Sequence, residues 1–176
     1  MSRFLETFPS AGPEHRVGPE PMQGRQSQLA TAPAEVQVFL DGKPWWDGAG
    51  GPAGTGSGIR DAVLGAYRTH GTRLFETARG HFALAIVDHA AQRVLLGVDR
   101  SGVGALAWAK ASGGQLVFGT SPRDVAQHPA VAAGLSRQAL FDYLYFHMVP
   151  SPGSAYTGVE KLRPAHCLLH ERGRTT

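Results

Sequence analysis

The sequence predicts a sheet-rich domain of mixed helices and strands, and three features lead to that class. Four short apolar runs, at residues 81–87, 94–98, 105–109 and 115–118, have the length of strands and are separated by polar or glycine residues. The separating segments are short, which favours antiparallel pairing between neighbouring strands. The first two runs are almost wholly apolar rather than alternating, which is typical of a sheet covered on both faces.

Upstream of these runs the pattern is less regular. Residues 1–34 have little periodicity and contain several Pro, Gly and Gln residues, so we predict an irregular N-terminal segment. Residues 35–40 (EVQVFL) alternate and predict a strand, and Asp41-Gly42 after it is a typical turn dipeptide. Residues 48–58 (GAGGPAGTGSG) have the composition of a flexible loop and lack the closing Gly-Lys-Ser/Thr of a phosphate-binding loop.

Three helices are predicted around the apolar runs. The first, over residues 59–70, ends before Gly71 and places five apolar side chains on one face: Ile59, Ala62, Val63, Ala66 and Tyr67. Ser121-Pro122 predicts the start of a short second helix. The third spans residues 136–146, with Ser136 as its cap and an apolar stripe of Leu140, Tyr143 and Leu144. Residues 159–169 predict a turn and a last strand.

Composition bounds the function. The chain has 176 residues, 42% of them hydrophobic, and a net charge of +3 without any run of like charges, so we expect neither nucleic-acid binding nor a basic membrane face. No apolar run reaches the roughly 20 residues that span a bilayer, and the first residues do not resemble a secretory leader. We therefore expect a cytoplasmic protein, and the preference for Arg over Lys suggests a bacterial source. The single Cys167 is expected to be a buried small apolar residue.

Several motifs in the central stretch occur in a known order. Residues 80–88 read GHFALAIVD, residues 95–109 read LLGVDRSGVGALAWA, and residues 116–120 read LVFGT. Residues 142–165 read DYLYFHMVPSPGSAYTGVEKLRPA. In this order and spacing, the chain resembles the N-terminal glutaminase domain of asparagine synthetases, a class II glutamine amidotransferase domain.

The resemblance implies a fold and a division of the chain. It implies an α+β fold of the N-terminal-nucleophile (Ntn) hydrolase type, a four-layer sandwich of two antiparallel sheets flanked by helices. It covers residues 35–170 as the amidotransferase-like domain, with 1–34 as the irregular N-terminal segment. Residues 171–176 would then be a tail leading to a synthetase domain absent from this chain. A fragment, a split gene product and a free-standing module all stay open.

The family's chemistry requires a few groups, and this chain departs from most of them. An N-terminal Cys attacks the glutamine amide, whereas Ser2 stands at that position here. An Asn-Gly pair donates hydrogen bonds to the oxyanion, whereas Asp41-Gly42 stands here and a carboxylate would repel that charge. The Asp that binds the substrate amine falls at Ile59, with Asp61 two residues later. Arg16, in His15-Arg16-Val17-Gly18-Pro19, is similar to the carboxylate-binding Arg apart from one inserted residue.

The resemblance therefore implies a glutaminase-like domain of an asparagine synthetase-type amidotransferase, with its own glutamine hydrolysis lost. We expect no cofactor in this chain, because ATP and Mg would bind a partner or downstream synthetase domain. The expected partner is such a domain or subunit, and a homodimer stays open. Two alternatives remain: a free-standing module that docks a separate synthetase, and an Ntn hydrolase that uses Ser2.

Two other polar groups have structural interpretations. His166 and His170 lie four positions apart on a predicted strand, roughly 13 Å from each other at about 3.3 Å per residue, which is too far for one metal ion. Asp99-Arg100 resembles a catalytic pair, but in the family it is a structural turn with an internal ion pair. We therefore predict no metal site and no catalytic role for either pair.

Overall fold

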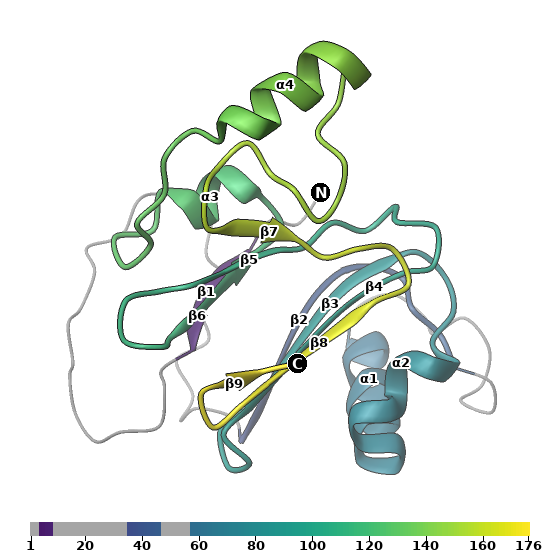
Figure 1. The fold of residues 1–176 in the computed structure, drawn as a ribbon. Helices are drawn as coiled ribbons and strands as arrows, with labels where there is room; N and C mark the ends of the chain where they lie inside the picture. The colour runs from purple at the N-terminus through teal and green to yellow at the C-terminus, as the bar shows by residue number, and fades with distance from the viewer. Residues whose placement is uncertain (1–3, 9–34, 47–56) are drawn as a thin grey trace.

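The computed structural model describes residues 4–8, 35–46 and 57–176, in which two antiparallel sheets carry most of the structure (Figure 1). The first sheet has the strand order β2-β3-β4-β8-β9, formed by Val36–Gly42, Phe82–Asp88, Arg93–Val98, Cys167–Glu171 and Arg174–Thr175. The second sheet has the order β1-β6-β5-β7, formed by Leu5–Phe8, Leu116–Gly119, Ala107–Lys110 and Val159–Lys161. The predicted hairpins β3-β4 and β5-β6 are confirmed, whereas β4 and β5 belong to different sheets.

Helices cover the outer faces of the two sheets, which gives a layered sandwich. The helices α1 (Ser57–His70) and α2 (Leu74–Thr77) pack on the five-stranded sheet, in a core cluster that contains Val63, Leu74 and Leu84. A second cluster, with Phe8, Leu96 and Phe118, fills the space between the sheets. On the outer face of the four-stranded sheet lies α3 (Pro122–Ala126), whose Val125 is fully buried. The predicted sandwich of two antiparallel sheets with helices outside agrees with this arrangement.

The unbroken apolar runs of β3 and β4 follow from this layering. Along β3, Ala83 and Ala85 belong to the cluster between the sheets, while Leu84 and Ile86 belong to the cluster under the helices. Successive side chains of a strand point to opposite faces, so a strand with a covered face on each side is apolar throughout. The prediction that this sheet is covered on both faces is confirmed.

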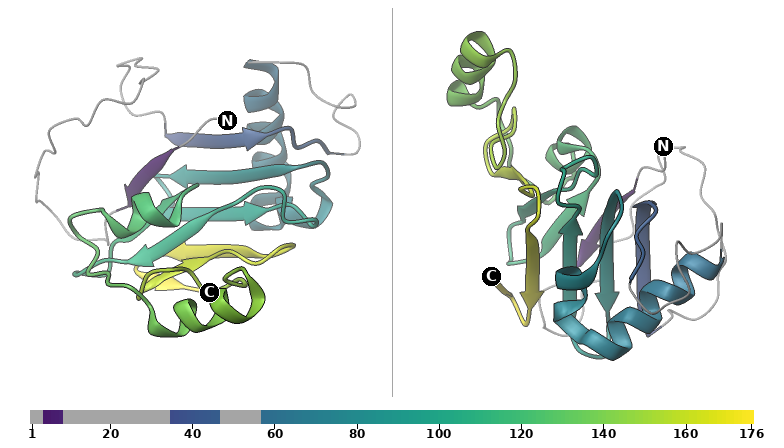
Figure 2. Two further views of the ribbon diagram at one scale, coloured as in Figure 1. Left: turned by 90° about the horizontal axis from the view of Figure 1, so that it is seen from above. Right: turned by 90° about the vertical axis from the view of Figure 1, so that its right-hand side faces the viewer.

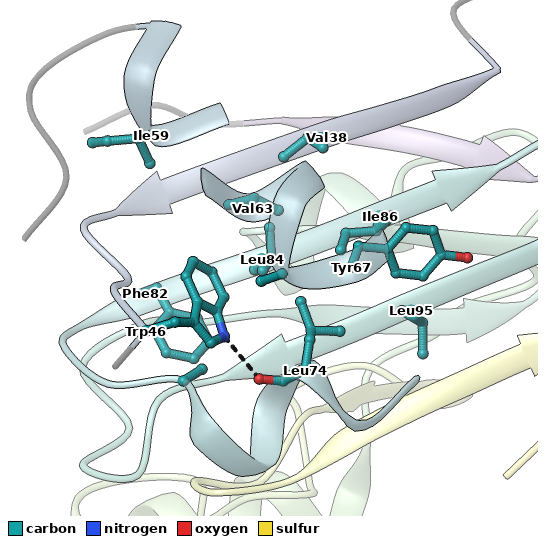
Figure 3. Close-up of a cluster of buried hydrophobic side chains, with 12 residues drawn as sticks. Val38, Trp46, Ile59, Val63, Tyr67, Leu74, Phe82, Leu84, Ile86 and Leu95 are labelled. Carbon is teal, nitrogen blue, oxygen red and sulfur yellow. Dashed lines mark hydrogen bonds between the residues drawn. The ribbon is translucent and has the colours of Figure 1, made fainter. Parts of the chain in front are cut away.

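The predicted face of α1 is the face that packs on the sheet. Ile59, Val63, Ala66 and Tyr67 are buried, and Trp46 closes the end of their cluster (Figure 3). The indole Nε1 of Trp46 donates a hydrogen bond of 2.9 Å to the carbonyl oxygen of Leu74, which begins α2. This bond ties the segment after β2 to the helical layer, where sequence periodicity had indicated no second helix.

Replacing Gly65, on the exposed side of α1, should stabilise the protein. A Cβ built at Gly65 meets no atom within 4 Å. Glycine in a helix interior is less favourable than alanine by about 0.5–1 kcal/mol, because it loses more backbone entropy on folding. We expect Gly65→Ala to raise the free energy of unfolding in urea by about that amount. A decrease would mean that this face of α1 is covered in the folded protein.

Three sequence-based boundaries are wrong. Residues 5–8, predicted as irregular, form β1, because pairing with β6 supplies hydrogen bonds that the local pattern does not reveal. Residues 171–176, predicted as a tail, form the end of β8 and then β9, and Leu169 exchanges backbone hydrogen bonds with Thr176. Asp41-Gly42 is no hairpin turn: both residues end β2 opposite β3, and pairing continues through the amide of Lys43, which donates to the His81 carbonyl at 2.8 Å.

Two helix starts follow the predicted capping. Ser121 accepts a hydrogen bond from the Asp124 amide at the start of α3, and Ser136 accepts one from the Ala139 amide at the start of α4 (Arg137–Phe146). The apolar stripe predicted for α4 does not pack on the domain, however: Leu140, Tyr143 and Leu144 are exposed. Within the described ranges, no helix has the length and apolarity needed to cross a membrane.

The buried His170 predicts a loss of stability at mildly acidic pH. Its Nδ1 lies 2.9 Å from the Thr175 hydroxyl, its Nε2 has no hydrogen-bond partner, and the ring packs edge-on to Phe8 at 6.2 Å between centroids. Burial, and secondly the nearby Lys110, lower the pKa of His170 from 6.5. As the pH falls below about 6.5, the unfolded chain therefore takes up the proton before the folded one, which favours unfolding.

We expect the urea midpoint of the wild type to fall between pH 7.5 and pH 5, and to fall less in His170→Gln. The matched control is His166→Gln, because His166 is exposed. That control should follow the wild-type pH profile. Equal pH profiles for the wild type and His170→Gln would contradict the assignment.

Candidate functional site

Several strands begin or end at one end of the sandwich, and the predicted site residues of β2 lie there. There β1 begins and β6 ends, since Leu5 pairs with Gly119 and the Thr120 amide donates to the Phe4 carbonyl at 3.1 Å. In the other sheet Gly42, the last residue of β2, pairs with Phe82. The rings of Phe4 and Phe39 lie 5.5 Å apart between centroids, so the residue before β1 faces the middle of β2 across the sheets.

Asp41 and Gly42 lie at this end, on an edge strand. Asp41 is partly buried opposite Ala83, and Gly42 is exposed with a φ of +104°. A Cβ at Gly42 would lie 2.2 Å from the His81 carbonyl oxygen, so the backbone conformation and the space both require glycine. A fixed kink therefore holds the Asp41 side chain at the end of β2.

The N-terminal half of α1 is tied to the same strand. The guanidinium of Arg60 donates a hydrogen bond of 3.0 Å to the Val38 carbonyl of β2. Asp61 is exposed on the next position of the helix, and Ile59 is buried in the cluster under the helices. The structure thus joins the elements that carry Asp41 and Asp61. Ile59, which the sequence resemblance aligns with an amine-binding Asp, is part of the core.

Two predicted site residues cannot be placed. Ser2 and Arg16 lie outside the described residues. Of the candidate residues, the structure therefore brings together Asp41, Gly42 and the helix that carries Asp61.

Asp99 organises the loop after β4 at the same end. Its carboxylate is 2% exposed and accepts hydrogen bonds from four backbone amides, those of Phe82, Ser101, Val103 and Gly104, at 2.7–3.3 Å. Burial by itself would raise the pKa of Asp99, but these amides, that of Gly104 foremost, stabilise the carboxylate and lower its pKa. The hydrogen bonds of the Asp99 carboxylate hold the loop, which supports the interpretation of Asp99 as a structural residue.

The predicted internal ion pair of Asp99 and Arg100 is wrong. Arg100 donates to the Glu76 carbonyl at 3.0 Å instead, because Asp99 turns inward to the backbone amides while Arg100 remains exposed. Arg100 thus links the loop to α2.

Two small cavities flank the Asp99 loop. One, of about 220 Å³, lies under α2 and is lined by residues that include Phe75, Arg100 and Cys167. The other, of about 200 Å³, lies between the loop and Thr120. Both are smaller than the roughly 300–1,000 Å³ of typical ligand pockets. Cys167, predicted to be buried, is exposed, because the helical layer leaves the first of these cavities over the start of β8.

Thr120 is a polar residue of the site end to which sequence reasoning gave no role. Its hydroxyl is buried without a hydrogen-bond partner, and its amide is bonded to Phe4. Buried polar atoms nearly always have a hydrogen-bond partner, so the unpartnered Thr120 hydroxyl beside β1 makes Thr120 a candidate site residue. Its place in the LVFGT motif was the signal that could have found it.

His166 and His170 do not share a partner. His166 is exposed with its Nδ1 2.8 Å from the Pro164 carbonyl oxygen, whereas His170 is buried beside Thr175. The predicted strand, which separates the two rings, is confirmed as β8. In the ranges that the structure covers, no three His, Cys, Asp or Glu side chains are grouped to hold a metal ion.

The comparison with known families now assigns the chain. The fold defines a mixed α/β domain in which two antiparallel sheets are stacked and flanked by helices. A family model described as a glutamine amidotransferase domain matches residues 56–176, well over half of the chain. The chain belongs to the glutamine amidotransferase domain family. A search of curated proteins found no match.

Proposed function

We propose that this chain is the glutaminase-like domain of an asparagine synthetase-type amidotransferase, and that its own glutamine hydrolysis is lost. The observation that carries the proposal is Asp41, held at the site end of β2 where the family places a carboxamide. An amidotransferase must stabilise the oxyanion that forms when the nucleophile attacks the amide. A carboxylate has acceptor oxygens and no donor, so Asp41 opposes that charge.

The substrate-binding positions support the same conclusion. Ile59 stands where the family binds the glutamine amine, and its side chain is buried among apolar residues. Ser2 stands at the nucleophile position. A serine can act as an N-terminal nucleophile, but it would work here without a suitable oxyanion donor at position 41.

The scaffold, by contrast, keeps the features that hold the fold together. Asp99 anchors its loop through four backbone amides, and its own carbonyl accepts from the Ala165 amide at 3.0 Å. Lys161 donates from its side chain to the Val149 carbonyl, and its amide donates to the Pro152 carbonyl at 2.8 Å. These residues belong to the motifs that the chain shares with asparagine synthetases. Retained scaffold residues beside altered site residues support the proposal of an Ntn-type fold whose catalysis is lost.

The chemistry would then depend on a synthetase partner. In this proposal ATP and Mg bind a synthetase domain or subunit of the same family, which activates a carboxylate such as that of aspartate with AMP. Free ammonia or another amine replaces glutamine as the nitrogen source. In this proposal, nucleotide and metal binding belong to that partner and not to this chain.

The loss of hydrolysis can be tested on the purified chain by following glutamate release from glutamine. We expect no release above background from the wild type, and none from Ser2→Ala. Asp41→Asn restores the missing carboxamide and serves as the matched variant: if only the oxyanion donor is missing, it should raise the rate. Glutamate release by the wild type that Ser2→Ala abolishes would instead establish an active hydrolase that uses Ser2.

The synthetase assignment needs a separate test. The DNA beside this reading frame is expected to encode a Ser-Gly-Gly-x-Asp-Ser loop, the ATP-pyrophosphatase signature of the family. Its product, mixed with this chain, ATP and a carboxylate substrate such as aspartate, should form the amide, AMP and pyrophosphate with ammonia as the nitrogen source and not with glutamine. Amide formation supported equally by glutamine would contradict the proposed loss. A neighbouring region without the loop would contradict the synthetase context.

A further inference from the structure

The small cavity beside Thr120 has one positive charge and no acidic side chain among the described residues that line it. It measures about 200 Å³ and lies between the loop after β4 and the end of β6. Its polar side chains are those of Thr120, Ser151 and Lys161, and the rest of the described lining is glycine, alanine, leucine and proline. A few polar groups on a largely apolar wall are typical of a site that orients a small ligand.

Lys161 brings an incompletely paired positive charge to this cavity. Its ammonium has three N–H donors, and within the described residues the Val149 carbonyl is its one acceptor. None of the ion pairs in that part of the chain involves Lys161. The side chain is half-buried, and burial lowers the pKa of Lys161 because it disfavours the charged form. An anion in the cavity would supply the counter-charge that the chain does not provide there.

Thr120 contributes a hydrogen-bonding group that is also unused. Its hydroxyl is buried without a partner, while its amide donates to the Phe4 carbonyl and fixes the residue at the end of β6. Buried polar atoms nearly always have a partner, so a molecule in the cavity would satisfy this hydroxyl. Ser151 is exposed and adds a second hydroxyl to the lining.

The volume and the charge of the cavity restrict the ligand. At about 30 Å³ for each water molecule, a cavity of about 200 Å³ is several times larger than one bridging water requires. It is smaller than the roughly 300–1,000 Å³ of typical ligand pockets, so the ligand is small. One ammonium balances one negative charge. This balance favours a carboxylate over a phosphate group, whose charge is about −1.5 to −2 at pH 7.

Only the folded chain brings these three polar groups together. Thr120 follows β6, Lys161 ends β7, and Ser151 lies on the segment that returns from α4 to β7. Figure 1 and the right-hand view of Figure 2 show α4 projecting beyond the four-stranded sheet and this segment running back to β7. The Lys161 side chain donates to the Val149 carbonyl, and the Lys161 amide donates to the Pro152 carbonyl at 2.8 Å. Ser151 therefore lies between two residues that are anchored to Lys161.

We propose that this cavity binds the carboxylate of a small molecule. Lys161 supplies the counter-charge, and the hydroxyls of Thr120 and Ser151 donate hydrogen bonds to the carboxylate oxygens. Such a site is separate from the proposed function, because Asp41 and Ile59, which carry the proposed loss of glutamine hydrolysis, do not line the cavity.

The test is a titration of the isotope-labelled 176-residue chain with sodium acetate, followed by NMR at the amides of Thr120 and Ser151. Sodium chloride at equal ionic strength is the reference. We expect saturable shifts with a Kd on the order of millimolar, since acetate offers few atoms for contact. Lys161→Met keeps the apolar stem and removes the charge, and it should weaken binding about tenfold or more.

Thr120→Val keeps the shape of the side chain and removes the hydroxyl, and it should weaken binding by about three- to tenfold. Because the lost oxygen has no partner in the protein, this variant stays informative even if Lys161→Met does not fold. Lys110→Met is the matched control: it removes the same charge from an exposed lysine that does not line the cavity, and its Kd should stay within about twofold of the wild type.

Three results would overturn the carboxylate site. Shifts that do not saturate, or that chloride reproduces, would mean that the cavity holds only water and non-specific ions. Acetate binding that neither Lys161→Met nor Thr120→Val weakens would place the acetate elsewhere. Tighter binding of inorganic phosphate at the same amides would make this a phosphate site. None of these results changes the expected absence of glutamate release, so the failure of this site and the failure of the proposed function are distinguishable.

Discussion

Asp99→Ala is expected to lower the free energy of unfolding by about 3 kcal/mol, because four backbone amides lose their shared acceptor at once. Each buried donor left unpaired costs about 1–3 kcal/mol, and hydrogen bonds to a charged group lie at the upper end. The amides of Ser101 and Val103 lie on an exposed loop, so water can replace part of their loss. Those of Phe82 and Gly104 are the costly ones, since they face the core of the loop.

The measurement is urea unfolding followed by tryptophan fluorescence. Asp61→Ala removes a carboxylate from an exposed helix position and serves as the matched control, with an expected change within about 0.5 kcal/mol. Asp99→Asn, which keeps one acceptor oxygen, should fall between the two. A loss below about 1 kcal/mol for Asp99→Ala would show that the loop is held by other contacts.

Gly42→Ala should cost about 2–4 kcal/mol and displace the end of β2. Its φ of +104° disfavours any residue with a Cβ, and the added atom would lie 2.2 Å from the His81 carbonyl oxygen and 2.9 Å from the Phe82 Cα. These clashes are relieved only if β2 and β3 separate at this point. The separation breaks the hydrogen bond from the Lys43 amide to the His81 carbonyl. Thermal unfolding measures the cost, and hydrogen exchange at the Lys43 amide reports the separation.

Gly113→Ala separates backbone strain from the clash. Gly113 has a similar φ of +92°, but a Cβ there meets no atom within 4 Å. It should therefore show only the cost of a left-handed backbone, about 1–2 kcal/mol. Equal losses of stability in Gly42→Ala and Gly113→Ala would mean that the His81 carbonyl does not lie as close to residue 42 in solution.

The candidate site was only partly predictable. The alignment of motifs selected Asp41, Gly42 and Asp61, and pairing in the structure places the first two at the end of β2, opposite Ala83 and Phe82. The role of Asp99 as an acceptor for four amides was not predictable in detail, because three of the donors depend on the conformation of the loop and the fourth comes from the distant β3. Thr120 was missed although it closes the LVFGT motif, because the sequence does not reveal that its hydroxyl is buried without a partner.

Local chemistry determined much of the secondary structure from the sequence alone. The unbroken apolar runs predicted β3 and β4, the spacing from Ile59 to Tyr67 predicted α1, and Ser121 and Ser136 predicted two helix starts, because burial periodicity and capping depend on near neighbours. Tertiary structure alone decided the features that depend on distant partners. Pairing with β6 makes residues 5–8 a strand, and pairing with β3 turns Asp41-Gly42 from a hairpin turn into a kinked strand end. The exposure of α4 is of the same kind: its residues are those of a buried helix, and only the arrangement of the other layers leaves them in solvent.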